Sequence, residues 1–289
     1  MHRRLALSLL VFGPVLGACT PAPARPDGAR IVALGSAVTE TLYALGVGDR
    51  LVGADLSSQH PAAAVALPKV GYFRQFSAEG VLSLAPNLVL ASDVSGPAVA
   101  LDRLRSAGVQ VQVLPPAVDL DGARANLRAI AHAVDRLTKG EALVATLDAQ
   151  VAQAQALLAV TTTRPRVLFV YARGPGTIMV AGRETPAAEL LRLAGAENAV
   201  DAFTDFRPLT AEAVIAARPE FIVVPDRGLE SLGGTASLLA LPGVQQTAAN
   251  TADRVVAIDD LKLLGFGPRT GEALLELVHA LHPELPAPS

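Results

Sequence analysis

The chain has 289 residues, of which 51% are hydrophobic and 18% charged, so it can fill the core of one large domain or of two ordinary ones. Its formal net charge of -3 is spread without charged blocks, which argues against a nucleic acid partner, because phosphate binding needs a basic face. Tryptophan is absent and aromatic residues make up only 4%, so each tyrosine or phenylalanine in a loop is informative.

The first 18 residues have the pattern of an export signal. A basic start, MHRR, precedes the apolar stretch LALSLLVFGPVL, which is too short to span a bilayer. The sequence LGAC follows at once and ends at Cys19, the single cysteine of the chain. We therefore predict a lipoprotein signal peptide over 1–18, lipidation of Cys19, and a Pro-rich tether over 19–28. Cleavage after Ala24 is the alternative; in both cases we expect an exported protein without disulfides.

Strands and helices alternate from residue 29 onward. Apolar runs predict strands over 30–34, 51–55, 87–92 and 110–115. Amphipathic spacing predicts helices over 37–47, 77–86 and 96–109. Such alternation implies parallel strands with right-handed crossovers, so residues 29–139 are expected to form an α/β lobe.

The pattern then changes and later resumes. Residues 122–137 and 139–162 contain no strand signal, and the second stretch, rich in Ala, Leu and Gln, predicts an interdomain helix over 140–162. Strands follow at 167–172, 220–225 and 254–259, with helices at 185–196, 210–219 and 268–281. The fold class expected is α/β, with a second lobe over 163–289.

One unit recurs in both lobes. The stretch SAEGVLSLAPNLVLAS aligns without a gap with TAEAVIAARPEFIVVP, so that the following pairs match: Ser77 with Thr210, Glu79 with Glu212, and Pro86 with Pro219. Helix capping, first-turn charge and a helix-ending proline could produce this likeness by convergence. Because the match covers both helix and strand without a gap, and each copy comes early in its own α/β region, the sequence favours two lobes of one kind.

Several segments together resemble a known family: RIVALGSAVTETLYALGVGDRLVGAD, GYFRQFSAEGVLSLAPNLVLAS and RVVAIDDLKLLGFGPRT. They are similar to the periplasmic haem-binding proteins of bacterial haem ABC importers, within the group that also carries vitamin B12 and ferric siderophores. The resemblance implies two similar α/β lobes with parallel sheets, joined by one long rigid helix. It also implies a ligand in the cleft between the lobes, little lobe closure, and no catalysis.

In that family a tyrosine in the motif that here reads GYFRQ binds the haem iron, and Tyr72 is the matching residue. Phenolate is a hard anionic donor suited to ferric iron. A free phenol has a pKa of about 10, so a nearby cation is needed to favour the ionised form. Arg74 would lie on the same side as Tyr72 if the segment is extended. The alternative is a tyrosine and an arginine on a surface loop.

The second lobe should supply the other wall of the haem site. The Gly-rich stretch VYARGPG follows a strand and contains Tyr171 and Arg173, where some relatives have a histidine. A second axial ligand is therefore in doubt, and we expect five-coordinate iron. Tyr171 could instead be the last core residue of its strand. Arg227 follows another strand and could meet a haem propionate or lie free on the surface.

The resemblance also implies partners. The transported ligand would be ferric haem b, delivered to an ABC permease dimer, with an outer-membrane haem receptor system upstream. Glu79 and Glu212 would each dock onto one permease subunit, a role compatible with that of first-turn helix charges. We expect a monomer that meets the membrane only through its lipid.

Two other hypotheses stay open from sequence. The same fold could carry a ferric siderophore or a cobalamin. An exported enzyme could use the cleft with Glu79 or Glu212 as acid or base, although neither carboxylate has a partner in sequence. The histidines are scattered without the spacing of a zinc or manganese site, and no P-loop or G-x-S-x-G motif occurs.

Overall fold

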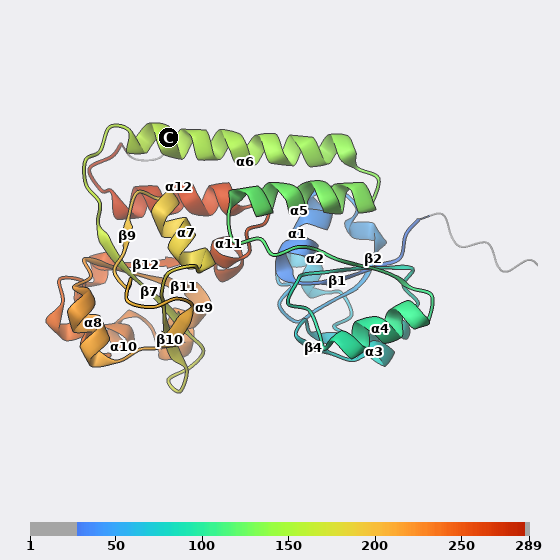
Figure 1. The fold of residues 1–289 in the computed structure, drawn as a ribbon, viewed down its shortest axis with the longest axis horizontal. Coiled ribbons are helices and arrows are strands. Elements are labelled where there is room, and N and C mark those ends of the chain that lie inside the picture. The colour runs from blue at the N-terminus through green and yellow to red at the C-terminus, as the bar shows by residue number, and fades with distance from the viewer. Residues whose placement is uncertain (1–27, 287–289) are drawn as a thin grey trace, which may run out of the picture.

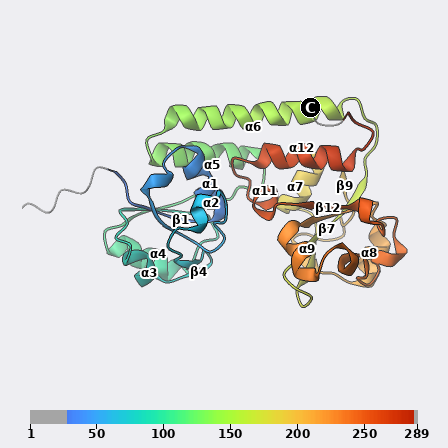
Figure 2. The same ribbon diagram turned by 180° about the vertical axis from the view of Figure 1, so that it is seen from behind.

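The computed structural model describes residues 28–286, so the predicted signal peptide, Cys19 and nearly all of the tether lie outside the described residues. Two α/β lobes lie side by side beneath one long helix, α6 (Leu137–Leu158), as Figures 1 and 2 show from opposite sides. The predicted fold class is confirmed. Within the described part, no helix has the length and apolar character needed to cross a membrane.

The first lobe is built on a four-stranded parallel sheet. Its strand order is β2-β1-β5-β6, with β1 at Ile31–Leu34, β2 at Leu51–Ala54, β5 at Leu88–Ala91 and β6 at Gln110–Val113. Every residue of the central strands β1 and β5 is buried. Continuous apolar runs are expected for parallel strands covered on both faces. The helices of this lobe are α1 (Ser36–Ala44), α2 (Ala62–Val65), α3 (Ala78–Leu82), α4 (Ala98–Ser106) and α5 (Leu120–Ala133).

The second lobe has a mixed sheet. The order is β10-β8-β7-β11-β12, with β9 also paired to β7: β7 at Arg166–Ala172, β8 at Ile178–Ala181, β9 at Glu197–Asn198, β10 at Phe206–Pro208, β11 at Phe221–Pro225 and β12 at Val255–Ile258. Strand β8 runs antiparallel to both of its neighbours, β7 and β10. Neither β8 nor β10 was predicted from the sequence. The connection between β7 and β8 is a short Gly-rich turn. It can join antiparallel strands, whereas a parallel crossover needs a dozen or more residues.

Helices surround the second sheet: α7 (Pro186–Leu193), α8 (Ala211–Ala217), α9 (Asp226–Leu232), α10 (Thr235–Leu239), α11 (Asp260–Leu264) and α12 (Thr270–Leu281). The repeated unit is present at the start of α3 and α8. The side chain of Ser77 accepts from the Gly80 amide, and that of Thr210 accepts from the Ala213 amide. These residues are therefore true N-caps, as the capping rules require.

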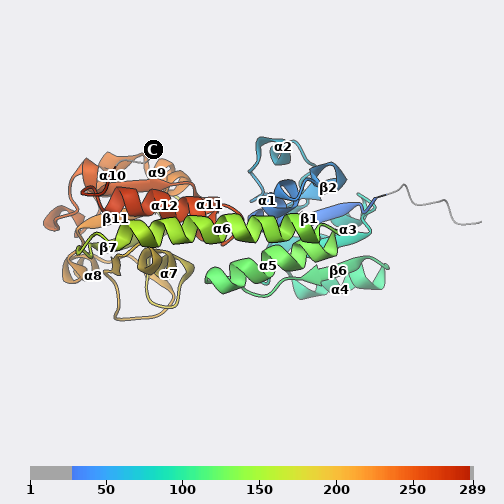
Figure 3. The ribbon, with the colours of Figure 1, turned by 90° about the horizontal axis from the view of Figure 1, so that it is seen from above.

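Helix α6 connects the lobes and packs against α5 of the first and α12 of the second (Figure 3). Its buried side chains come every three or four residues, at Val144, Leu147, Val151 and Ala154. Gly140 lets α5 approach closely, because a Cβ at this position would lie 2.4 Å from the Cβ of Ala131. The observed helix starts and ends before the range predicted for it, 140–162. The β-branched run VTTT that follows is a poor helix former.

A buried ion pair also joins the lobes. Arg269, the residue before α12, donates from Nε and a terminal nitrogen to the two carboxylate oxygens of Glu40 in α1, both at 2.7 Å. The same guanidinium lies 3.3 Å from Asp259. Burial lowers the pKa of Arg269, but the hydrogen bonds and charges of the two carboxylates outweigh it, and the pKa is raised overall. The pair thus fixes α1 of the first lobe against the start of α12 in the second lobe.

Candidate ligand-binding cleft

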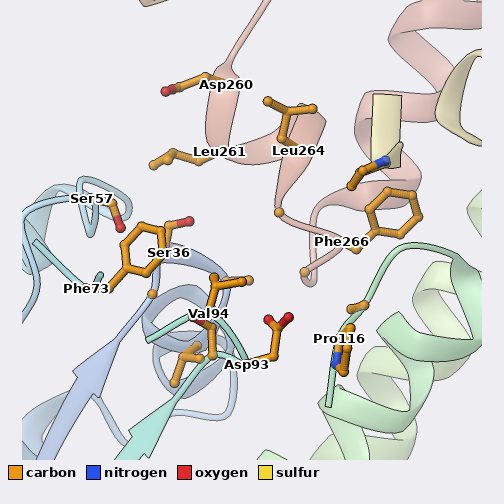
Figure 4. A pocket seen from close by; sticks show the side chains of 18 of the residues that line it. Ser36, Ser57, Phe73, Asp93, Val94, Pro116, Asp260, Leu261, Leu264 and Phe266 are labelled. Carbon is orange, nitrogen blue, oxygen red and sulfur yellow. The ribbon is translucent and has the colours of Figure 1, made fainter. Parts of the chain in front are cut away.

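A cleft of about 780 Å³ lies between the two lobes and is lined by residues from both. Its walls are formed by the residues that follow β1, β5 and β6 on one side and β7, β11 and β12 on the other. Both sheets thus direct the carboxyl ends of their parallel strands at the same space, which is where open α/β sheets bind ligands. Figure 4 shows side chains from the two lobes facing each other across this space.

Tyr72 and Arg74 both line the cleft, but they do not form the pair that the sequence suggested. The segment is a tight hairpin, with β3 at Gly71–Tyr72 and β4 at Gln75–Phe76, rather than an extended strand. Arg74 lies in the turn and is exposed, with its guanidinium carbon 5.4 Å from the centroid of the Phe73 ring. Among the described residues, Arg74 has no hydrogen bond to Tyr72. The expectation of an extended segment was wrong.

Arg173 from the second lobe contacts Tyr171 and interacts with Tyr72 only through its charge. Its Nε donates a hydrogen bond to the hydroxyl of Tyr171, and its guanidinium carbon lies 5.3 Å from the centroid of that ring. Burial lowers the pKa of Arg173, but the hydrogen bond to Tyr171 and the charges of Tyr171, Tyr72 and Asp260 raise it overall. The interaction with Tyr72 crosses the cleft, because Tyr72 belongs to the first lobe.

Tyr171 has one side in the core and one in the cleft. It is the residue before the last of β7, and its ring lies 5.9 Å from that of Phe206 while packing on the core of the second lobe. It also lines the cleft, where its hydroxyl meets Arg173. Tyr171 thus lies at the boundary between the core of the second lobe and the cleft.

Arg227 also lines the cleft, from the first turn of α9. Its side chain is half exposed, and its Nε lies 3.7 Å from Oδ1 of Asp260. Sequence reasoning missed Asp260, which is the first residue of α11 and also faces the cleft (Figure 4). Asp259 and Asp260, the two acidic residues directly after β12 (Val255–Ile258), were the available signal, since residues at the carboxyl end of a parallel strand face a ligand site.

Apolar side chains form much of the remaining lining. Leu56 and Val94 from the first lobe and Val118 before α5 are 52%, 40% and 48% exposed, which is high for aliphatic residues. On the other wall α11 contributes Leu261 and Leu264, which point into the cleft in Figure 4. The lining therefore combines apolar surface with a small set of charged groups, as ligand pockets usually do.

Glu79 and Glu212 lie outside the cleft, each in the first turn of its helix and exposed. In Figure 1 both helices, α3 and α8, lie on the side of their lobe that faces away from α6. Backbone and Ser77 hydrogen bonds and the charge of Arg103, at 3.0 Å, lower the pKa of Glu79. Glu212 has no ion-pair partner among residues 28–286.

Solved structures similar to this chain include two periplasmic heme-binding proteins. The periplasmic heme-binding protein RhuT from Roseiflexus sp. RS-1, in apo form, is 41% identical with a TM-score of 0.85, over 89% of this chain and 98% of RhuT. The periplasmic heme-binding protein BhuT, in complex with two hemes, is 42% identical with a TM-score of 0.82, over 88% of this chain and 99% of BhuT.

Two further relatives are less similar in sequence to this chain than RhuT and BhuT are. The uncharacterized ABC transporter substrate-binding lipoprotein YvrC of Bacillus subtilis is 27% identical over 90% of this chain and 82% of YvrC. The vitamin B12-binding protein of Vibrio vulnificus (strain YJ016) is 27% identical over 81% of this chain and 82% of its own length. The model of the family described as "Periplasmic binding protein" matches residues 31–261. This chain belongs to that periplasmic binding protein family.

Proposed function

We propose that this protein binds ferric haem b in the interlobe cleft and delivers it to an ABC permease for import. The observation that carries the proposal is that Tyr72 and the Tyr171–Arg173 pair, from opposite lobes, line one cleft with apolar walls. The heme-binding names of the two close structural matches support this ligand over a cobalamin, because the vitamin B12-binding relative is less similar. Within a family of binding proteins the role is transport, not catalysis.

Tyr72 is the proposed axial ligand of the haem iron. Arg173, rather than Arg74 as the sequence suggested, is the proposed cation beside the iron-bound phenolate, because it lines the same cleft and is held by its hydrogen bond to Tyr171. Tyr171 would lie on the opposite side of the porphyrin, held by Arg173, and five-coordinate ferric iron remains the expectation. The apolar lining, including Val94 and Leu264, would contact the porphyrin faces and edges.

The haem propionates would be met by arginine side chains at the cleft. Arg227 and Arg74 are both exposed on opposite walls of the cleft, so their guanidinium groups are available for two-point contacts with carboxylates. A cobalamin carries neutral amides around its corrin ring and offers these two arginines no pair of carboxylates. This charge pattern favours a dicarboxylate ligand.

The decisive experiment is a titration of the mature protein with hemin, with cobalamin and a ferric siderophore as rival ligands. We expect saturable binding of hemin with a high-spin ferric absorption spectrum of the phenolate type, and weak binding of both rivals. If the protein binds cobalamin saturably and leaves the absorption spectrum of added hemin unchanged, haem is not the ligand and the cobalamin alternative is favoured.

The permease partner is tested by charge reversal on the face formed by α3 and α8. We expect Glu79→Arg combined with Glu212→Arg to leave hemin affinity unchanged and to slow association with the permease by about tenfold or more, because rim charges steer docking. Glu272→Arg is the matched control, since Glu272 is an exposed first-turn residue of α12, beside α6. Equal rates of association with the permease for the wild type, the double variant and Glu272→Arg would argue against this docking face.

A further inference from the structure

Asp260 is an unusual group for a cleft proposed to receive an anionic ligand. Its side chain is 20% exposed, and its Oδ1 atom is buried without a hydrogen-bond donor in the part of the chain that the structure describes. The nearest cation is Arg227, with Nε 3.7 Å from that oxygen, too far for a hydrogen bond. A carboxylate placed in this way is costly to keep ionised, because burial removes water from Oδ1 and no hydrogen-bond donor takes its place.

The position of Asp260 sets up a competition. Arg227 is half exposed, so a carboxylate of a ligand in the cleft can reach the outer part of its guanidinium. Asp260 already lies beside the same group, with Oδ1 3.7 Å from Nε of Arg227. Two carboxylates that share one guanidinium repel each other, and this repulsion is strong where water is partly excluded. The ligand must therefore displace the counter-charge already present.

We infer that Asp260 is an internal counter-ion of the cleft, which holds Arg227 when no ligand is bound and weakens the binding of ligand carboxylates to it. Asp260 is thus a positioning residue that limits affinity, and this role rests on the proposed function. A binding protein must release its ligand to a permease, and a competing carboxylate inside the site accelerates that release. Its effect is confined to ligands with a free carboxylate.

The charges around Asp260 give the inference a pH dependence. Burial raises the pKa of Asp260, and the charge of Arg227 opposes this. Asp226 and Asp259 raise it further, whereas Arg173 lowers it. A ligand carboxylate beside Asp260 would raise the pKa again, so binding takes up a proton. The affinity is then highest below the pKa of the free protein and falls as the pH rises toward the pKa of the complex.

The test is a hemin titration of the wild type and the Asp260→Asn variant at about pH 6 and about pH 8, with calorimetry in buffers of different ionisation enthalpy. We expect Asp260→Asn to bind hemin about tenfold more tightly at the higher pH, with the gap narrowing at the lower pH. The wild type should take up more protons than the variant on binding. This difference isolates Asp260 from any proton released by Tyr72.

Three controls make the outcome decisive. Asp135→Asn alters an exposed aspartate that does not line the cleft and has no ion-pair partner among the described residues, and should change little. In an Arg227→Gln background, Asp260→Asn should give no further gain. Hemin dimethyl ester, which lacks free carboxylates, should bind the wild type and Asp260→Asn equally, and far-ultraviolet circular dichroism checks that each variant is folded.

The possible failures are distinguishable. A wild type that does not bind hemin would overturn the proposed function and this inference with it. A wild type that binds hemin, together with an Asp260→Asn variant of equal or lower affinity, would overturn only the role of Asp260. A gain in affinity that persists with the dimethyl ester would overturn that role too, because the ester has no carboxylate for Asp260 to repel.

Discussion

In a hemin titration of the Tyr72→Phe variant, we expect the phenolate-type absorption bands to disappear and the affinity to fall by about 100-fold or more. Removing a hydrogen-bonded neighbour of a metal ligand already costs 10- to 100-fold, so loss of the ligand oxygen itself should cost at least as much. Phenylalanine keeps the ring and its contact with Phe73, at 4.4 Å between centroids. The variant therefore removes one oxygen with little change in packing.

The chain contains two further tyrosines, which serve as matched controls. Tyr43→Phe alters a partly buried tyrosine of α1 that does not line the cleft, and should bind hemin as the wild type does. Tyr171→Phe should retain the phenolate bands, with a loss of a few-fold in affinity because Arg173 loses its hydrogen-bond partner. If Tyr171→Phe removes the bands and Tyr72→Phe does not, the axial ligand is on the second lobe.

Replacing Arg269 by methionine is expected to lower the free energy of unfolding by about 3–5 kcal/mol, because it leaves a carboxylate buried without its partner. Glu40 is 4% exposed and Arg269 14% exposed, and both hydrogen bonds between them are 2.7 Å long. The effect should be seen as a lower midpoint in urea unfolding. Glu40→Leu combined with Arg269→Met should recover most of the loss, since an apolar pair can replace a buried ion pair.

The control is a second ion pair of similar geometry on the surface. Arg128 donates two hydrogen bonds to Glu141, at 2.8 and 3.0 Å, but the side chains are 47% and 60% exposed. Arg128→Met should shift the urea midpoint far less than Arg269→Met does, because water screens exposed pairs. Equal losses for Arg128→Met and Arg269→Met would contradict the view that burial decides the strength of the interlobe pair.

Local rules explain why much of the fold was predictable. The apolar runs of β1 and β5, the caps Ser77 and Thr210, and the long uninterrupted stretch of α6 each depend on a few neighbouring residues. The antiparallel strands β8 and β10 were missed because they are short and carry no clear alternation. The hairpin at 71–76 was missed for the same reason, and with it the position of Arg74.

Sequence alone therefore determined the two-lobed α/β class, the long connecting helix and the identity of most of the charged and aromatic cleft residues, because these follow from short-range patterns and from the family resemblance. Only the tertiary structure decided which charged groups meet: Arg173 with Tyr171 and Tyr72, Arg227 with Asp260, and Glu40 with Arg269. Apart from Arg173 with Tyr171, these partners are far apart in sequence. Their pairing depends on how α9 and α11 pack within the second lobe and on how the two lobes pack together, which no local sequence preference encodes.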